Sequence, residues 1–229
     1  MTSDPRLFVA LDLPSVGEAE AMVDTLGDAV ESYKIGLQLL PIGGVEFGQR
    51  LKAMGKNVFY DFKLHDIGAT VEKATRSIAG LGADLLTVHA RPDVMRSAVT
   101  GKGQSTLKIL GVTVLTSLDQ QALEDIGYND NAEKLVMRRV QQALDAGIDG
   151  VVSSPLEAAA IRANVPESFL VVTPGVRPAG AEKGDQKRIA TPSSALTSGA
   201  SHLVVGRPIT QADDPRAAAL NICEEMRGH

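Results

Sequence analysis

The 229-residue chain has no tryptophan, a single cysteine (Cys223) and only 3% aromatic residues. One cysteine cannot form an internal disulfide, and such a low cysteine content fits a reducing compartment. No apolar run approaches the roughly 18–20 residues that a membrane-spanning helix requires. The first residues are polar and charged and lead directly into an apolar stretch, which is unlike a signal peptide. We therefore expect a cytoplasmic protein that does not enter a membrane.

The chain also lacks an excess of positive charge, because 23 Lys and Arg stand against 28 Asp and Glu, a net charge of −5. Bulk attraction to nucleic acid or to anionic lipid is therefore not expected. The four histidines show no metal-ligand spacing, and one cysteine cannot build a thiolate site, so we expect no metal and no cofactor. Hydrophobic residues make up 44% of the chain, enough for a self-sufficient core.

Short stretches rich in Val, Ile, Leu and Thr are typical of β-strands. They cover residues 6–13, 32–38, 57–64, 85–90, 107–116, 150–154, 169–174 and 202–206. Helical periodicity marks segments between them, at 15–27, 41–54, 67–81, 131–146 and 214–227. Gly82, Gly147 and Gly199 stand where a helix should end and a strand begin, since glycine readily adopts the left-handed conformation that closes a helix.

This alternation of strands and helices predicts a parallel sheet, and eight repeats predict its closure into a (β/α)8 TIM barrel. No change in composition indicates a linker, so we expect a single catalytic domain over residues 1–229. A doubly wound open sheet is the alternative. The turn after the first strand, Leu13-Pro14-Ser15-Val16-Gly17, disfavours it because the glycine-rich dinucleotide-binding fingerprint is missing. Barrel active sites lie at the C-terminal ends of the strands.

Charged side chains occur where these strands should face the barrel mouth. Side chains alternate across a strand, so Asp61 and Lys63 share a face with Phe59, while the opposite, apolar face should pack against helices. The same parity places Asp12 and Lys34 inward at the ends of the first two strands. An internal salt-bridge cluster is the structural alternative. Buried ion pairs rarely stabilise more than apolar packing, so four converging charges favour a functional site.

Asp66 lies outside this parity and directly precedes a helical segment. It would serve there as a helix N-cap, and this structural role is as compatible with the local sequence as a functional one.

The end of the chain offers groups suited to phosphate, which barrels commonly bind after strands seven and eight. Gly206 allows the backbone to approach a ligand closely, and Arg207 carries a forked guanidinium that matches phosphate oxygens. The long polar segment 177–190 could close over a ligand, with Arg177 and Gln186 reaching the phosphate. Composition alone favours an ordinary solvated loop for this segment.

The spacing of Asp61, Lys63 and Asp66 closely resembles the Asp-x-Lys-x-x-Asp signature of orotidine 5′-phosphate decarboxylases. Seven further motifs follow the family's order along most of the chain. They are Val9-Ala10-Leu11-Asp12, Lys34-Ile35-Gly36, Thr87-Val88-His89-Ala90, Val114-Leu115-Thr116-Ser117, Pro174-Gly175-Val176-Arg177-Pro178, Gly184-Asp185-Gln186-Lys187-Arg188 and Val204-Val205-Gly206-Arg207-Pro208. The chain departs from the family at Gly68-Ala69, where Pro-Asn is usual, and at Arg91-Pro92-Asp93, where a glycine-rich turn is common. The first departure predicts a looser helix start.

The resemblance implies a cofactor-independent decarboxylation of orotidine 5′-phosphate to uridine 5′-phosphate, the last step of de novo pyrimidine biosynthesis. It implies Lys63 as the proton donor, with Asp61, Lys34 and Asp66 as the other catalytic residues. It also implies a homodimer that binds the small nucleotide and neither nucleic acid nor membrane. The substrate-binding residues implied are Asp12, Lys34 and Asp61 at the ribose and carboxylate, Thr116 at the pyrimidine, Arg177, Gln186, Gly206 and Arg207 at the phosphate, and Thr70, which with Asp66 completes the neighbouring subunit's site.

Two other functions remain open at this point. A metal-dependent lyase of the same superfamily, acting on 3-keto-gulonate or hexulose phosphates, shares the Asp-x-Lys-x-x-Asp spacing. Such lyases typically carry an acidic metal ligand on the second strand, where this chain has Lys34. A barrel that binds phosphate without catalysis is the other alternative.

Overall fold

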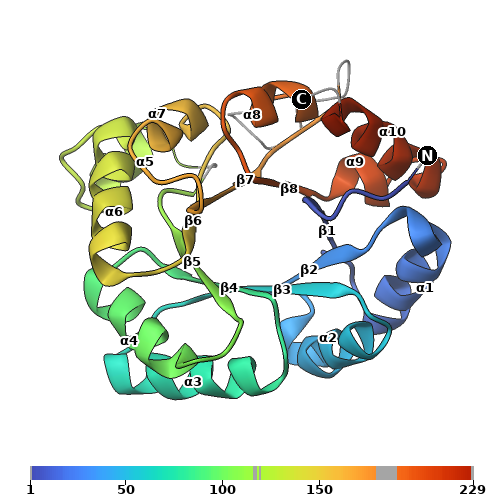
Figure 1. Cartoon of the computed structure of the whole chain (residues 1–229), viewed down its shortest axis with the longest axis horizontal. Helices are drawn as coiled ribbons and strands as arrows, with labels where there is room; N and C mark the ends of the chain where they lie inside the picture. The colour runs from blue at the N-terminus through green and yellow to red at the C-terminus, as the bar shows by residue number, and fades with distance from the viewer. Residues whose placement is uncertain (1, 116–117, 119, 179–189, 228–229) are drawn as a thin grey trace.

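The computed structural model describes residues 2–115, 118, 120–178 and 190–227. Its strands form one closed, parallel barrel in chain order. They are β1 (Leu7–Ala10), β2 (Ser32–Gly36), β3 (Asn57–Leu64), β4 (Leu85–His89), β5 (Lys108–Val112), β6 (Gly150–Val152), β7 (Leu170–Pro174) and β8 (His202–Val205). Figure 1 looks along the barrel, with the strands as an inner ring and the helices outside it. The predicted (β/α)8 barrel is confirmed, and the open-sheet alternative is wrong.

The helices follow the strands in turn. They are α1 (Val16–Leu26), α2 (Gly44–Ala53), α3 (Gly68–Gly80), α4 (Pro92–Lys102), α5 (Gln120–Asp125), α6 (Ala132–Ala146), α7 (Ala158–Arg162), α8 (Pro192–Thr197), α9 (Arg207–Thr210) and α10 (Pro215–Arg227), with 3-10 turns η1 (Gly27–Ala29) and η2 (Leu40–Ile42). The five segments expected from periodicity coincide with α1, α2, α3, α6 and α10. Helices α5, α7, α8 and α9 are too short to show a hydrophobic period. Among the described helices, none is both long enough and apolar enough to cross a membrane.

The core has two layers, which follow from the alternation of side chains along each strand. An inner cluster fills the barrel and consists of Phe8, Ala10, Phe59, Leu85, Leu110, Val172 and Val204. Its two phenylalanine rings meet edge to face, with centroids 5.7 Å apart. A larger outer cluster packs the strands against the helices and includes Val58, Tyr60 and Phe62 from β3 and the free thiol of Cys223. The expected division of β3 into an inner and an outer face is confirmed.

At the N-terminal end of the barrel, three helix-to-strand junctions repeat one device. Gly82, Gly147 and Gly199 have φ angles of 74°, 73° and 99°, as expected for glycines that end helices. Each junction then supplies a side chain that accepts a backbone N–H from the preceding strand. These acceptors are Oδ2 of Asp84 (2.6 Å, from β3), Oδ2 of Asp149 (2.8 Å, from β5) and Oγ of Ser201 (2.9 Å, from β7). The device ties strands together in pairs.

Candidate active site

A cavity of about 590 Å3 opens at the C-terminal ends of the strands. Side chains from β1, β2, β3, β5, β6, β7 and β8 or from the loops that follow them line it. The charged lining residues are Asp12, Lys34, Asp61, Lys63, Arg177 and Arg207, and Gly206 lines it as well. The structure therefore brings together seven of the residues that the sequence singles out, and it does so at the end of the barrel where chemistry is expected.

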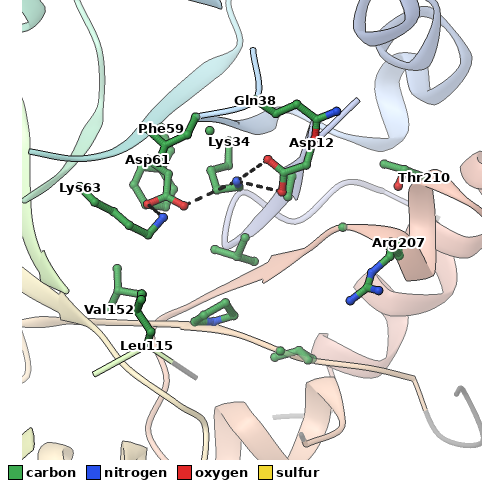
Figure 2. Close-up of a pocket in the computed structure, with 18 of the residues that line it drawn as sticks. Asp12, Lys34, Gln38, Phe59, Asp61, Lys63, Leu115, Val152, Arg207 and Thr210 are labelled. Carbon is green, nitrogen blue, oxygen red and sulfur yellow. Dashed lines mark hydrogen bonds and ion pairs between the residues drawn. The ribbon is translucent and has the colours of Figure 1, made fainter. Parts of the chain in front are cut away.

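Four of these charges alternate in sign along the first three strands (Figure 2). The ammonium of Lys34 donates to Oδ1 and Oδ2 of Asp12 at 2.9 and 3.1 Å and lies 3.6 Å from Oδ2 of Asp61. The ammonium of Lys63 lies 2.8 Å from Oδ1 of Asp61. Lys34 is the most deeply buried of the four, with 8% of its side chain exposed, whereas Asp12 is half exposed. The middle of the array is thus the most buried part, whereas Asp12 and Lys63 at its two ends are more exposed, and all four side chains line the cavity.

Room for this array depends on a glycine. Lys34 stands beside Ala10 in the parallel ladder of β1 and β2, and Gly36 follows two residues later on the same face. A Cβ at position 36 would lie 2.8 Å from Oδ1 of Asp12 and 2.8 Å from Nζ of Lys34, too close for either atom. The absence of a side chain at Gly36 therefore lets the ion pair form, a role that the sequence alone did not reveal.

Asp61 is held as a carboxylate by its surroundings. Burial raises its pKa, but the ammonium groups of Lys34 and Lys63 and hydrogen bonds from Lys63 and Thr87 outweigh burial, so the pKa lies below its usual value. An ionised Asp61 in turn stabilises the two ammonium groups beside it. The site therefore presents an ionised Asp61 between two lysines to whatever occupies the cavity.

Arginine side chains occupy another part of the cavity. Arg207 begins α9 immediately after Gly206, and Figure 2 shows it on the far side of the cavity from Asp61 and Lys63. Arg177 follows β7 and is 8% exposed, and among the described residues its Nε has no hydrogen-bond partner. Burial and the neighbouring Arg207 both lower the pKa of Arg177. Two adjacent guanidinium groups, one with an unused buried donor, are suited to an anion with several oxygens.

Asp66 and Thr70 lie apart from the cavity. Both are exposed at the start of α3, and neither is among the described residues that line the pocket. The expected N-cap role of Asp66 is wrong, because the N-cap is Ile67 and no side chain caps this helix. Oδ1 of Asp66 instead accepts from the adjacent N–H of Ile67 at 2.6 Å. The side chain of Ile67 is 69% exposed, an unusual state for isoleucine.

The unusual Gly68 takes part in a close packing contact between helices. Helix α3 begins at Gly68 without the usual proline. A Cβ at this position would lie 2.7 Å from Oγ of Ser97 on α4, so a larger residue here would require the Ser97 side chain to move. The glycine at this departure from the family pattern thus lies close against α4.

Some predicted residues lie beyond what the structure describes, and some functional candidates were missed. Thr116 and Gln186 fall outside the described residues. Gln38 and Thr210 line the cavity but carry no recognisable sequence signal. Thr87 belongs to the motif Thr87-Val88-His89-Ala90, which by itself indicates no role for the threonine. Its hydroxyl donates to Oδ1 of Asp61 at 2.9 Å.

The geometry also indicates whether these side chains could hold a metal ion. The described ranges contain no group of three or more His, Cys, Asp or Glu side chains that could hold a metal ion. Between the carboxylates of Asp12 and Asp61, the ammonium of Lys34 lies where a bridging cation would compete with it. The lysine ammonium groups at the cavity can stabilise and protonate negative charge.

Comparison with known proteins agrees with this geometry. Residues 5–222 match the family model described as "Orotidine 5'-phosphate decarboxylase / HUMPS family". The chain is 60% identical over 228 residues to the orotidine 5′-phosphate decarboxylase of Caulobacter sp. (strain K31), covering 100% of both chains. It is 55% identical to that of Methylorubrum extorquens (strain PA1), covering 98% of this chain and 97% of the relative. The crystal structure of orotidine 5′-phosphate decarboxylase from Lactobacillus acidophilus superimposes with a TM-score of 0.85 at 34% identity, covering 99% of each chain. The chain belongs to the orotidine 5′-phosphate decarboxylase / HUMPS family.

Proposed function

We propose that this chain decarboxylates orotidine 5′-phosphate to uridine 5′-phosphate, the last step of de novo pyrimidine biosynthesis, without a cofactor. The observation that carries the proposal is the Lys–Asp–Lys arrangement of Lys34, Asp61 and Lys63 inside a cavity that also holds two arginines. Full-length relatives named orotidine 5′-phosphate decarboxylase support it further. The whole chain, residues 1–229, acts as one catalytic domain, and its low cysteine content fits the cytoplasm.

Lys63 carries the central step of this proposal. When the bond between the ring carbon and the carboxylate breaks, carbon dioxide leaves and the electron pair stays on that carbon, in the plane of the ring. Delocalisation into the ring helps little, so a fixed cation must stabilise the charge. The Lys63 ammonium supplies it and then transfers its proton to the carbon, after which water restores the proton on lysine. Asp61, 2.8 Å away, favours the charged ammonium before the reaction.

The remaining charges of the array orient the substrate. Asp61 lies near the substrate carboxylate, and repulsion between the two groups is relieved as carbon dioxide departs. Lys34 bridges Asp61 and a ribose hydroxyl, and Asp12 accepts from ribose; the contacts of Lys34 with both carboxylates support this division of roles. Thr116 hydrogen-bonds the edge of the pyrimidine.

The phosphate occupies the arginine side of the cavity. Arg207 and Arg177 donate to its oxygens, Gly206 lets the backbone approach, and Gln186 reaches it from the segment after β7. The unused Nε of Arg177 and the proximity of the two guanidinium groups support this assignment. Binding energy from the phosphate, remote from the reacting carbon, then favours the arrangement that resembles the transition state.

The chain acts as a homodimer in this proposal, with Asp66 and Thr70 completing the neighbouring subunit's site. Their exposure outside the cavity, beside the exposed Ile67, fits a surface that a second copy covers. Mixing the inactive variants Lys63→Ala and Asp66→Ala should restore activity, because one site of each mixed dimer keeps both residues. Absence of restored activity in proven mixed dimers would contradict the shared site.

The reaction itself is tested by ultraviolet absorbance of orotidine 5′-phosphate incubated with purified protein and excess chelator. We expect the substrate spectrum to change to that of uridine 5′-phosphate at full rate. A strict magnesium requirement, together with turnover of a hexulose phosphate, would favour the metal-dependent lyase. An unchanged spectrum with intact ligand binding in both the wild type and Lys63→Ala would favour a barrel that only binds phosphate.

A further inference from the structure

The ladder between β3 and β4 is interrupted beside the candidate active site. Tyr60 pairs with Leu86 and Leu64 pairs with Val88, so residues 61–63 of β3 lie opposite one residue of β4, Thr87. Such a bulge redirects side chains relative to a regular strand. Two residues of the charged array, Asp61 and Lys63, lie within it.

Lys63 has an unusual backbone conformation within this bulge. Its φ is 48°, and among the described residues it alone combines a positive φ with a side chain. The left-handed region costs a non-glycine residue about 1–2 kcal/mol, so surrounding contacts must hold the lysine there. A strained backbone under the proposed proton donor indicates that its placement matters for function.

The hydroxyl of Thr87 makes those contacts. Thr87 is fully buried, and its Oγ1 accepts from the backbone N–H of Lys63 at 3.0 Å and donates to Oδ1 of Asp61 at 2.9 Å. A threonine hydroxyl has one proton and a carboxylate can only accept, so each hydrogen bond has a defined direction. Because Oδ1 of Asp61 also meets Nζ of Lys63 at 2.8 Å, the contacts form a closed ring through both ends of the lysine.

We propose that Thr87 is a positioning residue. It holds the Lys63 ammonium and the Asp61 carboxylate in a fixed position relative to each other without touching substrate. Thr87 is not among the described residues that line the cavity. The inference rests on the proposed decarboxylation only for its kinetic consequence, since the ring of contacts exists independently of the reaction. Without the hydroxyl, the Lys63 amide loses its partner and the Asp61 carboxylate is free to rotate.

Three variants separate positioning from packing. Thr87→Val keeps the shape and removes the hydroxyl, and Thr87→Ser keeps the hydroxyl. Thr173→Val is the matched control, because Thr173 is also a buried strand threonine and lies outside the cavity. We expect Thr87→Val to lower kcat by about tenfold to a hundredfold, the effect of a small misplacement, while KM stays within about threefold. Thr87→Ser and Thr173→Val should keep kcat within about threefold of the wild type.

The dependence of kcat on pH, on its acidic side, gives a second readout. The charged groups that face Asp61 are Lys34 from β2 and Lys63 from β3, and Asp12 acts on it through Lys34. Removing the Thr87 hydrogen bond removes one cause of the low pKa of Asp61, so the acid limb should move to higher pH in Thr87→Val and not in Thr87→Ser.

Amide hydrogen exchange at Lys63 supplies a readout that needs no turnover. We expect this amide to exchange at least about tenfold faster in Thr87→Val than in the wild type, since its buried acceptor is gone. If valine prevents folding, Thr87→Ala replaces it with the same expectations. Equal loss of kcat in the serine and valine variants, or an unchanged Lys63 exchange rate, would overturn the proposal. A wild type without decarboxylase activity refutes the proposed function instead, and the exchange measurement still decides the role of Thr87.

Discussion

At the N-terminal end of the barrel, the carboxylates of Asp84 and Asp149 accept backbone N–H groups and also pair with nearby lysines. At the C-terminal end, the carboxylates of Asp12 and Asp61 instead pair with lysine side chains of neighbouring strands. Asp84 lies 2.7 Å from Lys52, and Asp149 lies 2.6 Å from Lys102. In the first arrangement, each carboxylate links its own junction to the backbone of the strand before it. In the second, it holds ammonium groups that face a cavity.

The two ends also differ in repetition. The junctions before β4, β6 and β8 use Asp84, Asp149 and Ser201 in the same way, each binding the strand before it. At the mouth, the charged groups do not repeat in this way, and one of them, Lys63, has a strained backbone. Ion pairs of the same chemical type therefore serve stability at one end and, in our proposal, catalysis at the other.

The largest expected effect comes from a substitution within the charged array at the C-terminal end of the barrel. Lys63→Ala should lower kcat by about ten-thousandfold or more, because it removes both the proton donor and the cation that stabilises the carbanion. Lys108→Ala is the control, since Lys108 is an exposed lysine that pairs with Asp149 at the other end. Steady-state decarboxylation assays compare the two, and a Lys63→Ala enzyme within tenfold of the wild type would refute the assigned role.

A smaller effect is expected at the arginine side of the same cavity. Arg207→Ala should lower kcat/KM for orotidine 5′-phosphate by about a hundredfold or more, since each hydrogen bond to a charged group contributes about 1.5–3 kcal/mol. For orotidine, which lacks the phosphate, the same substitution should change little. Arg76→Ala, which removes a surface arginine of α3, serves as the control. Equal losses with both substrates would place Arg207 away from the phosphate.

At the N-terminal end, the expected effect is on stability. Asp149→Ala should lower the free energy of unfolding by about 2–3 kcal/mol, because it leaves a backbone N–H and a partly buried lysine without their partner. Its kcat should stay near that of the wild type. Denaturant unfolding measures the change, with Glu72→Ala in an exposed helical pair as the control, for which about 0.5 kcal/mol is expected. A large loss of kcat in folded Asp149→Ala would show that the two ends are not separate.

An effect that appears only below neutral pH is expected at His202, at the start of β8. Burial, with the nearby Arg6, lowers its pKa to about 4, whereas in the unfolded chain it titrates near about 6.5. Between these values the unfolded state binds the extra proton, so stability should fall as pH falls from about 6.5 toward 4, by up to about 1.4 kcal/mol per pH unit. The free energy of unfolding, measured by denaturant at several pH values across this range, should depend less on pH in His202→Gln than in the wild type. The exposed His65 provides the control in His65→Gln, and identical slopes in all three proteins would contradict the assignment.

Much of the barrel could be predicted from local sequence, because strands buried on both faces need runs of Val, Ile, Leu and Thr. The bounds expected for β3, residues 57–64, match those observed. Parity along β2 and β3 also placed Lys34 and Asp61 in the mouth, since alternation is a property of any strand.

What could not be predicted depends on contacts between distant segments. The bulge at residues 61–63 follows from the pairing of β3 with β4, and no local sequence pattern predicts it. Thr87 fits a buried strand equally well with or without a positioning role. The space around Gly36 is filled by Asp12, from the loop after β1, and by Lys34 of β2. Aspartate is a common N-cap residue, but the carboxylate of Asp66 accepts from the adjacent N–H of Ile67 instead of capping α3.

The separation of the two ends is tested most directly by measuring kcat for decarboxylation and the free energy of unfolding on the same preparations of wild type, Lys63→Ala and Asp149→Ala. We predict that Lys63→Ala loses nearly all turnover and keeps its stability, while Asp149→Ala loses stability and keeps its turnover. If activity instead falls in proportion to stability in both variants, the charged array at the mouth has no catalytic role of its own.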